Sequence, residues 1–167
     1  VQDNESKSTY GVIRGLHMQS GEFAQAKLVR VLEGKVIDVA VDVRPGSETF
    51  GQHVAIELSA DNKKQLFIPR GFLHGFSVLS DTATFFYKCD NFYNKESDGG
   101  VAYDDPDLGI VWPIEEKILS EYNLDSIVKI KNDRISITIG SEKHDTKLAN
   151  QIMNTVQNLY ETKMYIT

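Results

Sequence analysis

The chain has 167 residues, of which 41% are hydrophobic and 25% charged, and its formal net charge at pH 7 is −6. These values suit one globular domain with a hydrophobic core, and the negative charge argues against a broad nucleic-acid-binding surface. No apolar run approaches the roughly 18 residues of a transmembrane helix, and no signal peptide is visible, so we expect a cytoplasmic protein without a membrane partner. The single cysteine, Cys89, excludes an intramolecular disulfide and fits a reducing compartment.

The chain opens on a polar stretch, residues 1–10, which has no initiator methionine and is interpreted as a loop of a chain entered midway. The first strand is expected at residues 11–18, where Arg14 and His17 lie three positions apart and so on opposite faces of an ideal strand. Gly15 between them indicates a bulge, which would turn both side chains toward one cavity. A surface arginine and a core histidine are the ordinary alternative.

Short apolar segments separated by turn residues follow as far as residue 90. Residues 27–44 alternate around Glu33-Gly34 and predict a β-hairpin. Further strands are expected at residues 50–58, 65–69, 71–79 and 83–90. Many short strands with glycine, proline and aspartate between them are typical of an all-β sandwich or barrel.

The pattern changes after residue 91. Residues 94–100 are predicted to form a loop and residues 103–114 an irregular strap. Residues 134–140 alternate like a strand, and residues 145–165 have apolar positions at helical spacing. We therefore expect two parts, a β domain at residues 1–124 and a β-α appendage at residues 125–167.

Several polar side chains stand on the predicted strands and could carry chemistry. They are Lys27, at the start of an apolar strand, His74, between two glycines, and Tyr87, after two phenylalanines. Each also has an ordinary structural explanation as a surface charge, a core histidine or a packed tyrosine. A metal site is not expected, because no histidine has a second histidine two residues away and there is one cysteine. Nor does the sequence contain a nucleophile elbow, a P-loop or a dinucleotide-binding glycine turn.

Four segments occur in one order along the chain: RGLHMQ, AQAKLVRVLEGKVIDVAVDVRPGSETFG, LSADNKKQLFIPRGFLHGFSVLSDTATFFYKCDNFY and YDDPDLGIVWP. Together they resemble the dTDP-4-dehydrorhamnose 3,5-epimerase family, which consists of metal-independent sugar-nucleotide epimerases of the cupin superfamily. The resemblance spans about residues 1–123. It implies a cupin double-stranded β-helix (jelly roll), a homodimer, no cofactor, and epimerisation of dTDP-4-dehydro-6-deoxy-D-glucose at C3 and C5 in dTDP-L-rhamnose and cell-surface polysaccharide biosynthesis.

The resemblance also implies roles for individual residues. His17 stands at the position of the family's general base, Tyr87 at that of its acid, and Lys27 at that of the lysine near the sugar's C4 oxygen. Substrate contacts are implied for a further set of residues: Arg14 and His74, and, near the nucleotide, Gln2, Asn4 and Tyr93.

Two departures from the family pattern leave alternatives open. LSEYN at residues 119–123 puts Asn123 where the family has an aspartate that orients the histidine, and Asp125 is the possible replacement. The family's N-terminal strands, one of them carrying an arginine, are expected to be missing. The alternatives are a 3-epimerase or ketoisomerase acting on a related dTDP-4-keto sugar, and a truncated, weakened module for sugar-nucleotide binding or protein interaction.

Overall fold

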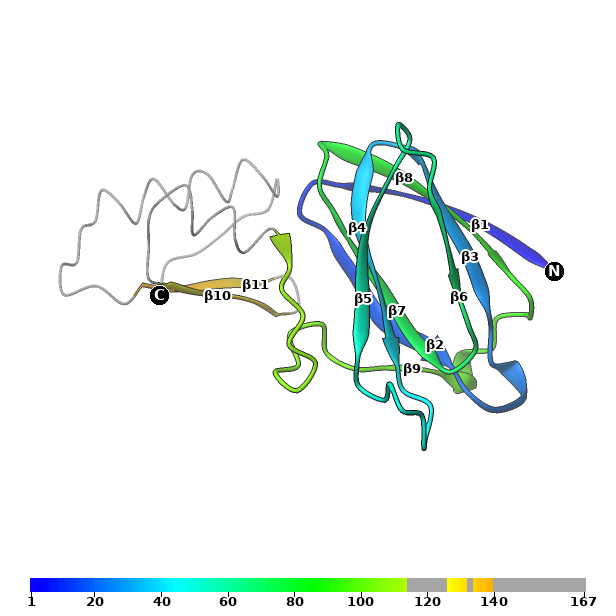
Figure 1. The fold of residues 1–167 in the computed structure, drawn as a ribbon. Helices are drawn as coiled ribbons and strands as arrows, with labels where there is room; N and C mark the ends of the chain where they lie inside the picture. Colours follow the sequence, from blue (N-terminus) through cyan, green and yellow to red (C-terminus); the bar gives the residue numbers. More distant parts are fainter. Residues whose placement is uncertain (114–125, 132–133, 140–167) are drawn as a thin grey trace. The chain divides into compact units, whose positions relative to one another are not determined.

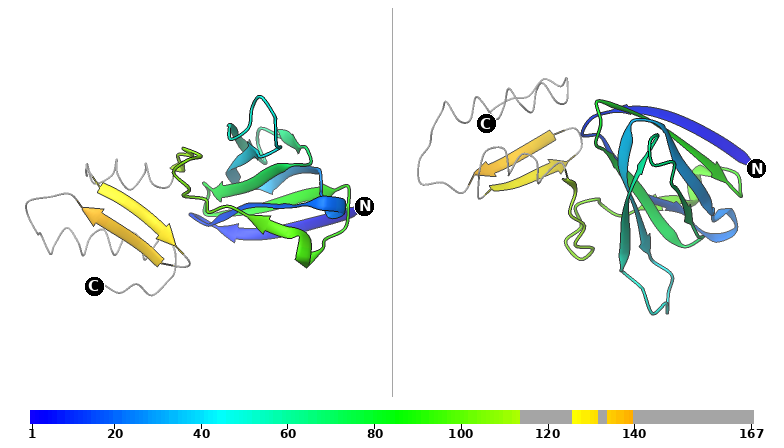
Figure 2. Two further views of the ribbon diagram at one scale, coloured as in Figure 1. Left: turned by 90° about the horizontal axis from the view of Figure 1, so that it is seen from below. Right: turned by 45° about the horizontal axis from the view of Figure 1, so that its top comes forward.

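The structure is a computed structural model, and it describes residues 1–113, 126–131 and 134–139. The chain divides into two compact units, Val1–Ile110 and Val111–Thr167. The first unit consists of two antiparallel sheets (Figures 1 and 2). These packed sheets confirm the predicted all-β jelly roll. No helix among the described residues is long and apolar enough to cross a membrane.

The two sheets draw their strands from alternating parts of the sequence. The four-stranded sheet has the order β1-β8-β3-β6, with β1 at Gln2–Thr9, β8 at Thr82–Cys89, β3 at Lys27–Glu33 and β6 at Gln65–Ile68. The five-stranded sheet has the order β5-β4-β7-β2-β9, with β5 at His53–Ser59, β4 at Lys35–Asp42, β7 at Phe72–Val78, β2 at Ile13–Gln19 and β9 at Asp98–Gly100. Two short 3₁₀ helices, η1 (Gly21–Phe23) and η2 (Lys95–Ser97), lie in the connections.

The core lies between the sheets because each strand turns alternate side chains inward. On β3 the inward-facing residues Val29 and Val31 are buried. Leu28, which faces outward, is partly exposed. Phe76 of β7 stacks on Phe85 of β8, with ring centroids 4.3 Å apart and planes inclined by 13°. This aromatic pair joins the two sheets at the centre of the core.

The first ten residues are not a loop, and that prediction was wrong. β1 pairs antiparallel with β8 over its whole length, from Gln2 opposite Cys89 to Thr9 opposite Thr82. It is an edge strand of its sheet, and its side chains alternate between exposed and partly buried positions. Backbone hydrogen bonds hold such a strand, so its sequence needs no apolar alternation.

The predicted hairpin at residues 27–44 is also wrong, although both of its strands exist. β3 pairs with β6 and β8, whereas β4 pairs with β5 and β7. Gly34 lies between β3 and β4 at φ 75°, and a side chain there would collide with the carbonyl oxygen of Thr82. Gly34 therefore carries the chain from one sheet to the other, rather than back along its own sheet.

The later segments follow the predictions in part. The predicted loop at residues 94–100 contains η2 and the short strand β9, which pairs with β2. In the second unit β10 (Ser126–Lys131) and β11 (Arg134–Ile139) form an antiparallel pair, and β11 lies where residues 134–140 predict a strand. The predicted helix at residues 145–165 lies outside the described residues.

Candidate active site

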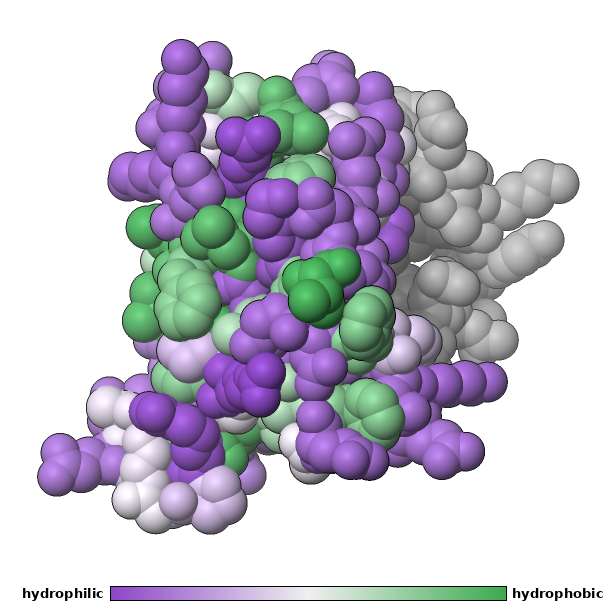
Figure 3. Space-filling view, turned by 90° about the vertical axis from the view of Figure 1, so that its right-hand side faces the viewer, coloured by the Kyte–Doolittle hydropathy of each residue, from purple (hydrophilic) through white to green (hydrophobic). Residues whose placement is uncertain are grey.

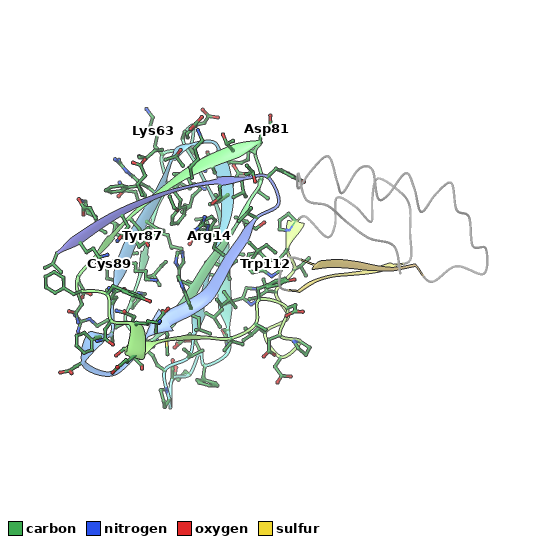
Figure 4. The ribbon with its side chains drawn as sticks, turned by 180° about the vertical axis from the view of Figure 1, so that it is seen from behind. Arg14, Lys63, Asp81, Tyr87, Cys89 and Trp112 are labelled. Atoms are coloured by element: carbon green, nitrogen blue, oxygen red, sulfur yellow. The ribbon has the colours of Figure 1, made fainter. Side chains whose placement is uncertain are left out.

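A cavity of about 90 Å³ opens between the two sheets of the first unit. Both sheets contribute to its walls, β1, β3 and β8 from one and β2 and β9 from the other. Figure 4 shows Tyr87, Cys89 and Arg14 within the unit, away from the rim where Lys63 and Asp81 lie. The ten lining residues are Gln2, Asn4, His17, Gln19, Gln25, Lys27, Tyr87, Cys89, Tyr93 and Asp98.

A bulge lies in β2 between Arg14 and His17. β2 pairs with β7 as Arg14 opposite Phe76 and His17 opposite His74, with a register shift between them. Gly15 lies in this irregular stretch at φ 112°, and a side chain there would collide with the backbone of β7. The predicted bulge is therefore present, and it brings His17 to the cavity. Arg14 does not line the cavity, and its Nε donates a hydrogen bond to Ser8 Oγ at 3.0 Å.

His17 is a neutral imidazole at physiological pH. Its Nε2 lies 3.5 Å from Lys27 Nζ on the facing sheet. Removal from water by the cavity walls has the largest effect on His17 and, together with the electrostatic effects of Lys27 and His74, lowers its pKa to about 4. Asp98 has a smaller, opposing effect. A neutral imidazole has a free nitrogen lone pair, so His17 can accept a proton from a ligand.

Lys27 and Tyr87 complete the inner part of the cavity. Lys27 is 8% exposed, and burial lowers the pKa of its ammonium group. Its Nζ lies 6.0 Å from the centroid of the Tyr87 ring. Burial raises the pKa of Tyr87, with Cys89 acting in the same direction and Arg14 against it. The phenol therefore retains its proton at neutral pH and can act as a proton donor.

A buried histidine–carboxylate pair lies next to His17. His74 is 4% exposed and Asp38 is fully buried, and His74 Nε2 lies 3.1 Å and 3.0 Å from the two carboxylate oxygens of Asp38. The rings of His17 and His74 have centroids 6.3 Å apart. Sequence reasoning missed Asp38, although its position between Val36 and Ala40 on an alternating strand places it on the core side of β4.

The outer part of the cavity carries amides and an exposed aromatic ring. Gln2 Nε2 donates to Asn4 Oδ1 at 2.8 Å, and the backbone N–H of Tyr93 donates to Gln2 Oε1 at 3.2 Å. Tyr93 is 58% exposed, so its ring is available for stacking. Sequence reasoning missed Asp98, the carboxylate that β9 adds to this wall.

The structure thus gathers most of the predicted site residues. Six of them line the cavity, namely Gln2, Asn4, His17, Lys27, Tyr87 and Tyr93. His74 lies next to His17 without lining the cavity, and Asn123 and Asp125 lie outside the described residues. Within the described part of the chain, no group of three histidine, cysteine, aspartate or glutamate residues could hold a metal ion.

Comparison with known proteins agrees with this geometry. Residues 1–129 match the family model described as dTDP-4-dehydrorhamnose 3,5-epimerase. Proteins of that name from Shigella flexneri and Escherichia coli are 54% and 50% identical over 124 and 137 residues, covering 74% and 78% of this chain and 68% and 74% of theirs.

Solved structures give the same assignment. A dTDP-4-dehydrorhamnose 3,5-epimerase from Elizabethkingia anophelis aligns with a TM-score of 0.68 at 66% identity, over 70% of this chain and 64% of that one. A dTDP-6-deoxy-D-glucose-3,5-epimerase from Legionella pneumophila in complex with dTDP-4-keto-L-rhamnose aligns with a TM-score of 0.66 at 57% identity, over 68% of this chain and 60% of that one. This chain therefore spans less than two thirds of the length of these two solved relatives. It belongs to the dTDP-4-dehydrorhamnose 3,5-epimerase family.

Proposed function

We propose that this protein is a cytoplasmic epimerase that converts dTDP-4-dehydro-6-deoxy-D-glucose to dTDP-4-dehydro-L-rhamnose. One observation carries the proposal: a neutral imidazole, His17, and a proton-bearing phenol, Tyr87, line one cavity from opposite sheets. The Lys27 ammonium lies 3.5 Å from His17 Nε2 and 6.0 Å from the centroid of the Tyr87 ring. Inversion at carbon needs a base and an acid on opposite sides of the reacting atom. The family membership and the bound product in the Legionella relative support the same substrate.

The chemistry follows from the substrate's 4-keto group. Hydrogens at C3 and C5 are acidic because each carbanion is delocalised onto the C4 oxygen as an enolate. His17 removes the proton, Lys27 stabilises the charge on the enolate oxygen, and Tyr87 returns a proton from the other face. The ketone itself provides the activation, so the proposed reaction needs no redox cofactor.

The remaining site residues are assigned to binding. Gln2, Asn4 and Tyr93 line the outer part of the cavity and suit the nucleotide, with the Tyr93 ring stacking on the base. Arg14 and His74 are proposed to contact the substrate. We further propose that Asn123 or Asp125 orients His17, and that residues 125–167 form a β-α appendage to a catalytic domain at residues 1–124.

A homodimer is part of the proposal. The outer face of the four-stranded sheet has a depression of about 230 Å³ lined by Leu28, Arg30, Gln65, Phe86 and Lys88. Phe67 on the same sheet is 63% exposed. Figure 3 shows the side of β3 and β6, where hydrophobic residues lie among hydrophilic ones. Apolar area of this kind supports self-association, and light scattering on the purified protein would give twice the 18.8 kDa mass.

The direct test of the function is turnover in deuterium oxide. The protein is incubated with dTDP-4-dehydro-6-deoxy-D-glucose, and the product is analysed by NMR and mass spectrometry. The proposal predicts deuterium at both C3 and C5 with inversion at both carbons. Deuterium at C3 alone would indicate a 3-epimerase, and binding without exchange would indicate a sugar-nucleotide-binding module; either result contradicts the proposal.

A further inference from the structure

Asp38 is a charged residue in the middle of the hydrophobic core. It lies on β4 between Val36 and Ala40, which both belong to the core cluster, and its exposed fraction is 0%. Within the described part of the chain, His74 is its one hydrogen-bond partner. Replacing a buried ion pair with apolar residues is often neutral or stabilising. Stability therefore does not explain why a carboxylate is at this position.

The contacts of His74 show what the carboxylate does. Its ring stacks on Phe85, with centroids 5.9 Å apart and planes inclined by 27°, and its strand β7 places it directly opposite His17 on β2. Both oxygens of Asp38 contact Nε2, and an ionised carboxylate only accepts hydrogen bonds. Nε2 must therefore carry a hydrogen, so His74 can gain or lose a proton only at Nδ1. Among the described residues, Nδ1 has no hydrogen-bond partner.

We propose that Asp38 is a positioning residue, which fixes the ring and the tautomer of His74 so that Nδ1 is the nitrogen offered to substrate beside His17. The proposal rests on the proposed epimerase function for the identity of the substrate. The orientation of His74 by Asp38 concerns the free protein and is tested separately. In a Ser-His-Asp triad, the aspartate likewise holds the imidazole in one orientation and one tautomer. An asparagine at that position permits the wrong tautomer.

The first test is ¹⁵N NMR of the histidine rings in the full chain. The sequence has four histidines, so His→Gln variants assign every signal. In the wild type we expect Nε2 of His74 to stay protonated throughout a pH titration. In Asp38→Asn the amide can donate to Nε2, so we expect the Nδ1–H tautomer to appear. Asp42→Asn is the matched control. Asp42 is on the same strand and 1% exposed, but it accepts hydrogen bonds from Arg44, Ser47 and Thr49. Its replacement should leave the His74 signals unchanged.

The second test is a double-mutant cycle in the epimerase assay. We expect Asp38→Asn to lower kcat/KM by about 10- to 100-fold, the range found when the hydrogen-bond partner that orients a metal-ligating histidine is removed. In a His74→Gln background the same change should cause no further loss, because Asp38 acts through His74.

Three results would overturn the proposal. They are an Nδ1–H tautomer in the wild type, His74 signals in Asp38→Asn identical to those of the wild type, and an undiminished effect of Asp38→Asn in the His74→Gln background. If Asp38→Asn does not fold, the wild-type titration decides alone. If the chain lacks epimerase activity, the proposed function fails while the ring spectra still decide whether Asp38 fixes His74.

Discussion

Replacing Lys27 by methionine should raise the pKa of His17. The Lys27 Nζ lies 3.5 Å from His17 Nε2, and its charge is the second-largest cause, after burial, of the low pKa of His17. A unit charge at this distance changes the energy of the imidazolium by about 1 kcal/mol even in a water-like dielectric. That corresponds to a rise of about one pH unit. Methionine retains the apolar packing of the lysine stem, so the effect of burial should persist.

The assay is an NMR titration of the His17 ring in the wild type and in Lys27→Met. The control is Lys88→Met on the same sheet, because Lys88 is exposed and pairs with Asp3; it should leave the titration of His17 unchanged. A His17 pKa in Lys27→Met that equals or falls below the wild-type value would refute the electrostatic coupling of the two groups.

Three further predictions concern stability and the second catalytic group. Between about pH 6.5 and pH 4, His17 binds a proton in the unfolded chain but not in the folded chain. The free energy of unfolding should therefore fall as the pH falls through this window. Urea titrations should show a smaller fall in His17→Gln. Tyr87→Phe should retain deuterium exchange at C3, because the base survives, but lose inversion at C5, as NMR of the product would show. Phe85→Ala should lower the free energy of unfolding by about 3–5 kcal/mol in urea titrations, because Phe85 is 1% exposed and stacks on Phe76, whereas Phe50→Ala, at 59% exposure, should change it by about 0.5 kcal/mol or less.

The sequence predicts the strands better than it predicts their partners. Alternation of apolar residues reveals β3 and β4 because each buries one face, but it carries no information on which strand lies alongside. The chain passes at Gly34 into the other sheet, and only the tertiary structure shows this crossing. The sequence does not predict β1 for a different reason. An edge strand that is held by backbone hydrogen bonds needs no apolar face.

The site could be predicted where residues match family motifs, and not where the signal is a single carboxylate. His17, Lys27 and Tyr87 were assigned from the resemblance, and the structure places all three at one cavity. The alternation of β4 puts Asp38 on the core side with Val36 and Ala40, but the sequence does not show that His74 of β7 lies against its carboxylate. Asp98 follows a polar segment that resembles an ordinary loop, and its role at the cavity depends on β9 pairing with β2.

The measurement that tests the central claim most directly is solvent deuterium incorporation by His17→Gln. If His17 is the base, this variant should incorporate no deuterium at C3 or C5 of dTDP-4-dehydro-6-deoxy-D-glucose, because glutamine cannot accept the proton. His53→Gln is the control, since His53 lies on β5 away from the residues that line the cavity, and it should incorporate deuterium at the wild-type rate. Undiminished incorporation at either carbon by His17→Gln, with its fold intact by circular dichroism, would contradict the assignment of His17 as the base for that carbon.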